Sequence, residues 1–158
     1  LLRDTGAPLA PFNAWQIIQG LETVGLRMKQ HCSNAEKVVT FLETQKKVQN
    51  VIYPTNHQGE IKERAKRYME GGYGSLVGMD VGTRENGAKF IDNLKMLYHV
   101  ANIGDARSLA IHPATTTHSQ LNDEELLAAG VTPGYVRLSI GIEHPDDIVA
   151  DIKQALAA

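Results

Sequence analysis

Residues 102–118 read NIGDARSLAIHPATTTH, and residues 135–142 read YVRLSIGI. The first stretch places a Gly-Asp turn, a short apolar run, two histidines and three consecutive threonines in one connection. The second stretch alternates apolar side chains with a single cation, so it predicts a strand in which Arg137 shares a face with Tyr135 and Ser139. Because ligand contacts concentrate on loops that a rigid scaffold holds, we expect the two stretches to form one site.

Outward from these stretches, helices alternate with strands over short connections. Gly and Pro interrupt residues 1–10, which predicts a loop or short arm, and residues 12–45 predict a long helix that bends near Gly25. The other expected strands cover residues 48–53, 75–81, 97–103 and 108–111, and the other expected helices cover residues 61–70, 84–94, 123–129 and 145–156. The third of these helices should bury Leu126 and Leu127. This order predicts an α+β domain in which helices cover one face of a small sheet.

The composition is that of a soluble globular domain. The chain has 158 residues, 42% of them hydrophobic and 22% charged, with a net charge of −2. It has no basic block, which disfavours nucleic acid or an anionic membrane as a partner, and no apolar run approaches the ~20 residues that span a bilayer. The single cysteine, Cys32, cannot form an internal disulfide, which favours the cytoplasm. The chain begins at Leu1 without an initiator methionine, so we expect a piece of a longer protein.

Several kinds of site are weakly indicated. His112, His118 and Asp105 are possible metal ligands, but the spacing of the histidines matches no common zinc pattern. Ser108, His112 and Asp105 supply the residue types of a hydrolytic triad, but the G-x-S-x-G nucleophile elbow is missing. Cys32 on an apolar helical face is more typical of a core residue than of a reactive thiolate. No G-x-G-x-x-G or P-loop pattern indicates a self-contained nucleotide site.

Arg137 is the strongest functional candidate on physical grounds. A guanidinium on a sheet face presents two parallel donors that match a carboxylate. The alternatives are an ordinary solvent-facing arginine or an internal ion pair with Glu143 or Asp105. Asn102 either serves a turn or donates its amide to a ligand oxygen. The first two threonines of the TTT run are expected to cap the turn that follows.

Together, residues 102–118 and the VRLSIGIE segment at 136–143 resemble the C-terminal domain of the pyridoxal-phosphate enzymes of cysteine and methionine metabolism, most closely the O-acetylhomoserine sulfhydrylases. The likeness also includes PFNA at 11–14, GLET at 20–23, LRM at 26–28, HCSNA at 31–35, DDI at 146–148 and DIKQAL at 151–156. The resemblance implies an aminotransferase-like C-terminal domain with a small, mainly antiparallel sheet. Residues 1–45 would form an N-terminal arm and a long bridging helix, and residues 46–158 the small α+β domain.

The same resemblance implies the function. Members of the family eliminate or replace the γ-substituent of homoserine esters, and this version favours replacement of the acetate of O-acetyl-L-homoserine by sulfide or methanethiol. Arg137 would bind the substrate's α-carboxylate, Asn102 and the backbone of Ile103 would lie at the same carboxylate, and Thr117 would lie close to that pocket. In the complete enzyme, a homo-oligomer, pyridoxal 5'-phosphate would be bound by another domain of the same polypeptide.

The family's Schiff-base lysine, cofactor-stacking aromatic residue and phosphate-binding loop precede the segments that match here. We therefore expect no catalytic residue, cofactor-binding residue or metal ligand in this chain, and no activity from the chain alone. Two alternatives stay open: a standalone, non-catalytic binding or oligomerisation module of the same fold, and the same domain from a cystathionine or methionine γ-lyase. We also expect Trp15 and Ile18 to be partly exposed, and the isolated chain to self-associate through them.

Overall fold

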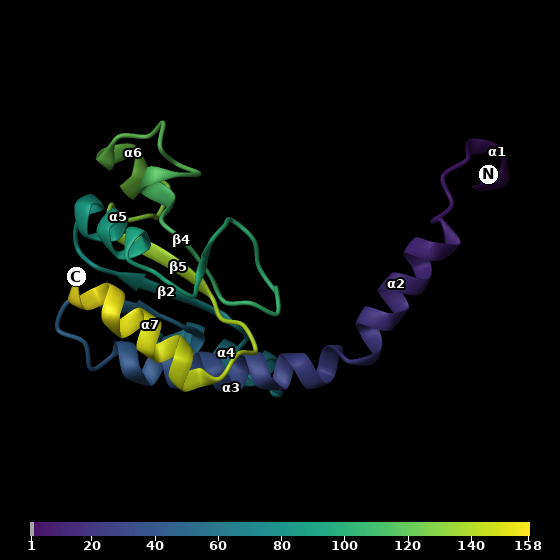
Figure 1. Cartoon of the computed structure of the whole chain (residues 1–158), viewed down its shortest axis with the longest axis horizontal. Helices are drawn as coiled ribbons and strands as arrows, with labels where there is room; N and C mark the ends of the chain where they lie inside the picture. Colours follow the sequence, from purple (N-terminus) through teal and green to yellow (C-terminus); the bar gives the residue numbers. More distant parts are fainter. Residues whose placement is uncertain (1) are drawn as a thin grey trace.

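The computed structural model describes residues 2–158, with the side chains of residues 4–158. Leu1, where the predicted arm begins, lies outside the described residues. Three helices open the chain: α1 (Leu2–Thr5), α2 (Pro11–Glu22) and α3 (Val24–Leu42). Figure 1 shows α1 and α2 reaching away from a globular body, while α3 runs along that body.

The predicted bend in the long helix lies at Thr23, between α2 and α3, and Gly25 lies inside α3. Arg27 stabilises the bend, because its guanidinium donates to Thr23 Oγ1 at 2.5 Å and to the carbonyl of Gly20 at 2.9 Å. The glycine pattern therefore predicted the break correctly but misplaced it slightly, since the side-chain bridge that holds it leaves no periodic signal.

Five strands form one sheet in the order β1-β2-β5-β4-β3. They are β1 (Asn50–Ile52), β2 (Leu76–Asp80), β3 (Tyr98–His99), β4 (Leu109–Ile111) and β5 (Tyr135–Ser139). All neighbouring pairs are antiparallel except β3 and β4. The prediction of a small, mainly antiparallel sheet is confirmed, and β5 is its central strand.

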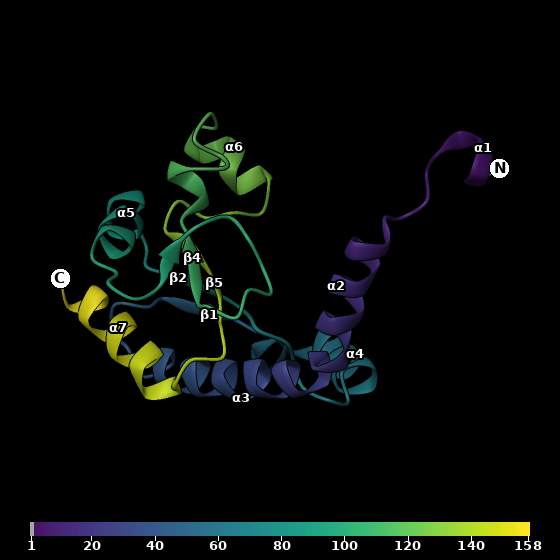
Figure 2. The same cartoon turned by 45° about the vertical axis from the view of Figure 1, so that its right-hand side comes forward.

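Helices cover one face of this sheet, as predicted. The remaining helices are α4 (Gly59–Tyr68), α5 (Arg84–Asp92), α6 (Asp123–Ala128) and α7 (Pro145–Ala157), with short 3-10 turns η1 (Pro54–Asn56) and η2 (Pro113–Thr115). Both views place α3 and α7 below the strands (Figure 1 and Figure 2). The core lies between this layer and the sheet; it includes Val77, Met79, Val136 and Leu138 from the strands and Val38, Leu42, Phe90, Ile148 and Ile152 from the helices. Within residues 2–158, no helix combines the length and apolar character needed to cross a membrane.

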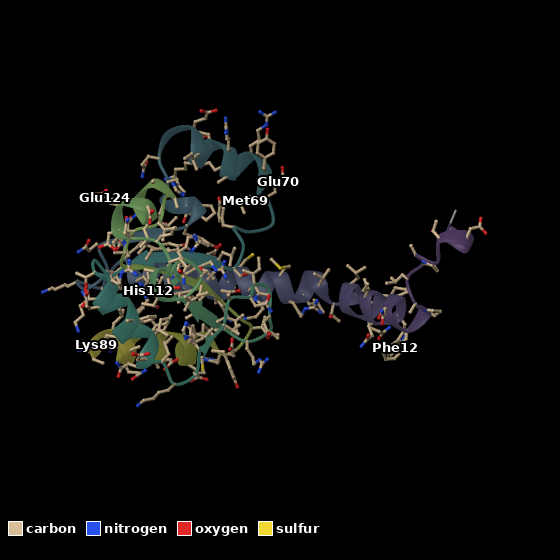
Figure 3. All side chains as sticks on the ribbon, turned by 90° about the horizontal axis from the view of Figure 1, so that it is seen from above. Phe12, Met69, Glu70, Lys89, His112 and Glu124 are labelled. Atoms are coloured by element: carbon tan, nitrogen blue, oxygen red, sulfur yellow. The ribbon has the colours of Figure 1, made fainter. Side chains whose placement is uncertain are left out.

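We call α1 and α2 together the arm; no side chain of α2 is buried. Trp15 is 55% exposed and Ile18 54% exposed, so the expected exposure of these two residues is confirmed. Phe12 stacks against Trp15 with ring centroids 5.7 Å apart, and Figure 3 shows Phe12 far from the body. Helix α2 therefore exposes apolar side chains that the described body does not cover.

Two expectations are wrong. The strand expected at residues 97–103 is only β3, because the chain leaves the sheet after His99 and forms a loop with Gly104 at a φ of +77°. The apolar Val100 and Ile103 suggested a strand, but both are exposed in that loop.

In α6, Leu126 is buried but Leu127 is exposed, since consecutive helical residues point about 100° apart and this short helix has one buried side. The start of α6 is as predicted: Asn122 Oδ1 accepts from the backbone N–H of Glu125, whose carboxylate accepts from the Asn122 N–H in return.

Candidate functional site

Arg137 lies in the central strand, on the sheet face that the helix layer leaves open. In β5, Val136 and Leu138 are buried and Tyr135 and Arg137 half-buried, so the burial alternates over these four residues as predicted. Ser139, expected on the face of Arg137, is buried, and its hydroxyl accepts the Gly104 N–H of the loop that follows β3. Across the sheet, Arg137 stands beside Gly78 of β2 and Ile111 of β4. The strand thus packs the core with one set of side chains and presents the guanidinium with the other.

Gly78 makes room for this arrangement. A Cβ at Gly78 would lie 2.7 Å from Tyr135 Cε2 and 3.1 Å from Ile52 Cβ, so the ring of Tyr135 occupies the space above the glycine. Burial raises the pKa of Tyr135, with the Arg137 charge acting in the opposite direction. The phenol therefore remains neutral and forms a wall beside the guanidinium.

The Arg137 guanidinium is incompletely paired. Its Nη2 donates to the carbonyl of Asn102 at 3.4 Å, and its Nε is buried without a hydrogen-bond partner among the described residues. The alternative of an internal ion pair is wrong, because the carboxylate of Glu143 accepts from Ser108 and that of Asp105 accepts from Arg107. A buried donor without a partner costs about 1–3 kcal/mol, more for a charged group, so this site favours an anion.

Arg137 lines the first of two adjoining hollows. One, of about 210 Å³, is lined by Arg137, Tyr135, His57, Tyr53, Gly78 and their neighbours. The other, of about 500 Å³, is lined by Ile103, Gly104, Met28, Tyr73, Ser75 and others. Pro54 and Leu76 line both hollows. A ligand that binds the guanidinium in the first hollow can therefore extend past Leu76 into the second, which is mostly apolar.

Asn102 and Ile103 lie on the loop that follows β3, and the backbone carbonyl of Asn102 contacts Arg137. The side-chain oxygen of Asn102 accepts the Ile103 N–H at 2.9 Å, which supports the turn interpretation. Among the described residues the Asn102 amide nitrogen has no partner, and the side chain is exposed. The structure thus brings Asn102 and Arg137 into direct contact and places Ile103 in the neighbouring hollow.

Thr117 lies apart from this group. It is exposed, its Oγ1 pairs with Nδ1 of His118 at 2.9 Å, and it lines neither hollow. Its proposed place near the substrate pocket stays a prediction.

His112 is a core residue. Its ring nitrogens lie 3.0 Å from Thr115 Oγ1 and 2.8 Å from the Pro133 carbonyl, and Figure 3 shows the residue inside the body. Burial lowers the pKa of His112, which keeps the imidazole neutral. Ser108 pairs with Glu143 instead, so no hydrolytic triad forms. Within the described part of the chain, no three His, Cys, Asp or Glu side chains are placed to hold a metal ion.

Cys32 is buried at 7% exposure, and a Cβ on Gly72 would lie 2.7 Å from its sulfur. This close packing confirms its interpretation as a core residue.

The sequence did not indicate Tyr53, His57 or Tyr135 as neighbours of Arg137. The first two come from the segment after α3, whose register against β5 is transmitted through β2 and has no local pattern. Tyr135 was assigned to the correct face, but the missing side chain of Gly78 that lets its ring lie flat is visible only across strands. Alternation within one strand predicts a face and not the partners on it.

Comparison with known proteins concerns the family and the fold of the chain. The family described as Cys/Met metabolism PLP-dependent enzyme matches residues 1–157. O-acetyl-L-homoserine sulfhydrylase of Leptospira meyeri is 52% identical over 98% of this chain and 36% of its own length. O-acetyl-L-homoserine sulfhydrylase 1 of Thermus thermophilus is 45% identical over 99% of this chain and 37% of its own length.

A solved structure from Campylobacter jejuni, described as an O-acetylhomoserine (thiol)-lyase, superposes with a TM-score of 0.88 at 44% identity. It carries N'-pyridoxyl-lysine-5'-monophosphate at its position 205. The match covers 99% of this chain and 38% of that chain, so the present chain spans little more than a third of the proteins it matches.

Proposed function

Since this chain belongs to the family of Cys/Met metabolism PLP-dependent enzymes, we propose that it is the C-terminal, substrate-carboxylate-binding domain of an O-acetylhomoserine sulfhydrylase. The complete enzyme would replace the acetate of O-acetyl-L-homoserine by sulfide or methanethiol, on the way to homocysteine and methionine. The observation that carries the proposal is the incompletely paired guanidinium of Arg137 on the open face of the sheet.

The role of Arg137 is to bind and orient the amino acid. A carboxylate in the adjoining hollow would accept two hydrogen bonds from the guanidinium, one of them from the Nε that has no other described partner. The backbone carbonyl of Asn102 accepts from the same guanidinium, and we propose that the Asn102 side-chain amide turns toward the bound carboxylate and donates to it. The aliphatic part and the ester of the substrate would then extend past Leu76 into the larger, mostly apolar hollow.

Pyridoxal phosphate supplies an electron sink for carbanion chemistry when it is bound to such enzymes. The residues of this chain do not fit that group, because no lysine lines either hollow. Lys29, Lys89 and Lys153 are exposed on their helices, and Figure 3 shows Lys89 at the outer surface of α5. We therefore propose that another part of the polypeptide holds the cofactor and that this chain alone is inactive.

The exposed arm supports this division of roles. The apolar side chains of α2, such as Trp15 and Ile18, have no partner in the described body. In the complete enzyme, which we propose to be a cytoplasmic homo-oligomer, the cofactor domain of the same polypeptide would cover them. A standalone oligomerisation module would instead cover this surface with a second copy of the chain.

The test is Arg137→Lys in the complete enzyme, with Arg64→Lys as the matched control. Lysine keeps the charge but loses the two-pronged geometry, and hydrogen bonds to charged groups are worth roughly 1.5–3 kcal/mol. We expect KM for O-acetyl-L-homoserine to rise about 10- to 100-fold. Among the described residues, Arg64 pairs with Glu60 on the surface of α4, so its variant should behave as wild type. An unchanged KM in Arg137→Lys would refute the assignment.

A further inference from the structure

Glu143, just beyond β5, holds the loop that carries Asn102. One carboxylate oxygen of Glu143 accepts the backbone N–H of Ser108 at 2.6 Å, and the other accepts the Ser108 hydroxyl at 2.9 Å. The hydroxyl in turn accepts the Gly141 N–H at 2.8 Å. Both carboxylate oxygens thus bind a single loop residue, which returns a bond to the segment that carries the carboxylate.

The position of Glu143 is itself fixed from the helix layer. The buried amide of Asn34 on α3 donates to the carbonyls of Gly141 at 3.0 Å and Glu143 at 2.8 Å. The buried ring of His31 lies 2.6 Å from the carbonyl of Ile140. The backbone after β5 is therefore bound to α3 on one side, while the Glu143 side chain reaches the loop on the other.

Besides the long Arg137–Asn102 bond, two hydrogen bonds join the loop to β5 and the residues after it. The Gly104 N–H donates to Ser139 Oγ at 3.3 Å, and the Ile142 N–H donates to the carbonyl of Ala106 at 2.8 Å. Both involve neutral partners, whereas Glu143 accepts with a carboxylate, and charge-assisted hydrogen bonds are roughly twice as strong. Glu143 is therefore the main attachment of the loop whose first residue contacts Arg137.

We propose that Glu143 is a positioning residue for substrate binding: it holds residues 102–108 against β5 so that Asn102 and Arg137 converge on one carboxylate. This inference rests on the proposed function. Glu143 touches neither hollow, so it acts through the loop and not on the ligand. A displacement of about 1 Å in a positioning group costs roughly 10²-fold in rate, so a loosened loop should weaken substrate binding measurably.

The experiment is a double-mutant cycle in the complete enzyme with Glu143→Ala, Asn102→Ala and the double variant. We expect Glu143→Ala to raise KM for O-acetyl-L-homoserine about tenfold with a smaller change in kcat. If Glu143 acts through Asn102, the double variant should be little worse than Asn102→Ala alone. Glu143→Gln keeps an acceptor for the Ser108 N–H and should recover part of the loss. Glu124→Ala, an exposed glutamate on α6 (Figure 3), is the control and should leave KM unchanged.

Additive effects of the two substitutions on KM, or a lowered melting temperature with an unchanged KM, would overturn the inference. The two proposals fail separately. A normal KM in Arg137→Lys refutes the proposed function, regardless of the results for the Glu143 variants. A raised KM in Arg137→Lys without coupling between Glu143 and Asn102 refutes only the positioning role of Glu143.

Discussion

Gly141→Ala tests the close approach of the loop to the end of β5. A Cβ at Gly141 would lie 2.5 Å from the carbonyl oxygen of Ala106 and 2.5 Å from the carbonyl carbon of Arg107, and it would also contact Glu143 Oε2. Two of these neighbours are backbone atoms, and the third is a carboxylate fixed by two hydrogen bonds. None can move without breaking an attachment of the loop.

The cost follows from this geometry. Gly141 is not among the glycines with positive φ, so alanine meets no backbone strain there and the penalty is steric. Overpacking typically costs 1–3 kcal/mol, and immovable neighbours place this site near the upper end, at about 3 kcal/mol. For a chain of this size, 1 kcal/mol corresponds to roughly 2–4 °C, so Tm should fall by about 6–12 °C.

The assay is thermal and urea unfolding of the purified chain at neutral pH, followed by circular dichroism. Gly20→Ala is the matched control: Gly20 lies inside α2, and a Cβ there has nothing within 4 Å. That variant should keep the Tm of the body and gain helical signal, because Ala is favoured over Gly in a helix by about 1 kcal/mol. If Gly141→Ala loses less than about 1 kcal/mol, the loop does not pack on β5 as described.

Two further predictions concern pH and association. The carboxylate of Asp151 accepts the backbone N–H groups of residues 95–97 at 2.8–2.9 Å. Burial raises the pKa of this carboxyl, but the hydrogen bonds outweigh burial and bring the pKa below its usual 3.8. The stabilisation is therefore present above pH 3.8 and lost as the pH falls further. Asp151→Asn should lower Tm by about 3–8 °C at pH 7, and the difference in Tm between wild type and variant should shrink in acid. A difference in Tm that stays the same between pH 7 and pH 3 would contradict this. The isolated chain should self-associate through α2, and Trp15→Glu should reduce the weight-average mass in sedimentation at high concentration, whereas a wild-type chain that stays monomeric there would exclude the arm as an association surface.

The fold was readable where burial repeats with a regular period. Alternation over residues 135–139 predicted β5 and the face of Arg137, and the helical periods predicted α3, α5 and α7. The error at residues 97–103 has a physical cause. Val100 and Ile103 are apolar, and the Val100 N–H still donates to the carbonyl of Ala110. Beyond Val100 the loop is held by the side chains of Ser139 and Glu143, which accept the N–H groups of Gly104 and Ser108, and no periodicity reports such long-range bonds.

The site was readable only in part. Arg137 and Asn102 were assigned as neighbours, and the structure joins them. That assignment came from the resemblance to a family, since the alternation alone left Arg137 equally compatible with a solvent-facing role. The walls of the hollows, such as Tyr53 and His57, depend on strand register across the sheet, which local sequence does not encode.

The alternation in β5 has a consequence for how this chain tolerates mutation. Val136 and Leu138 face the core, while Tyr135 and Arg137 face the open side, so neighbouring positions should tolerate mutation differently. A variant library of the complete enzyme scored by protein abundance should penalise changes at 136 and 138, and under the proposed function one scored by growth without methionine should also penalise 137. Along this strand, positions that affect stability therefore alternate with positions that affect activity, with a period of two residues.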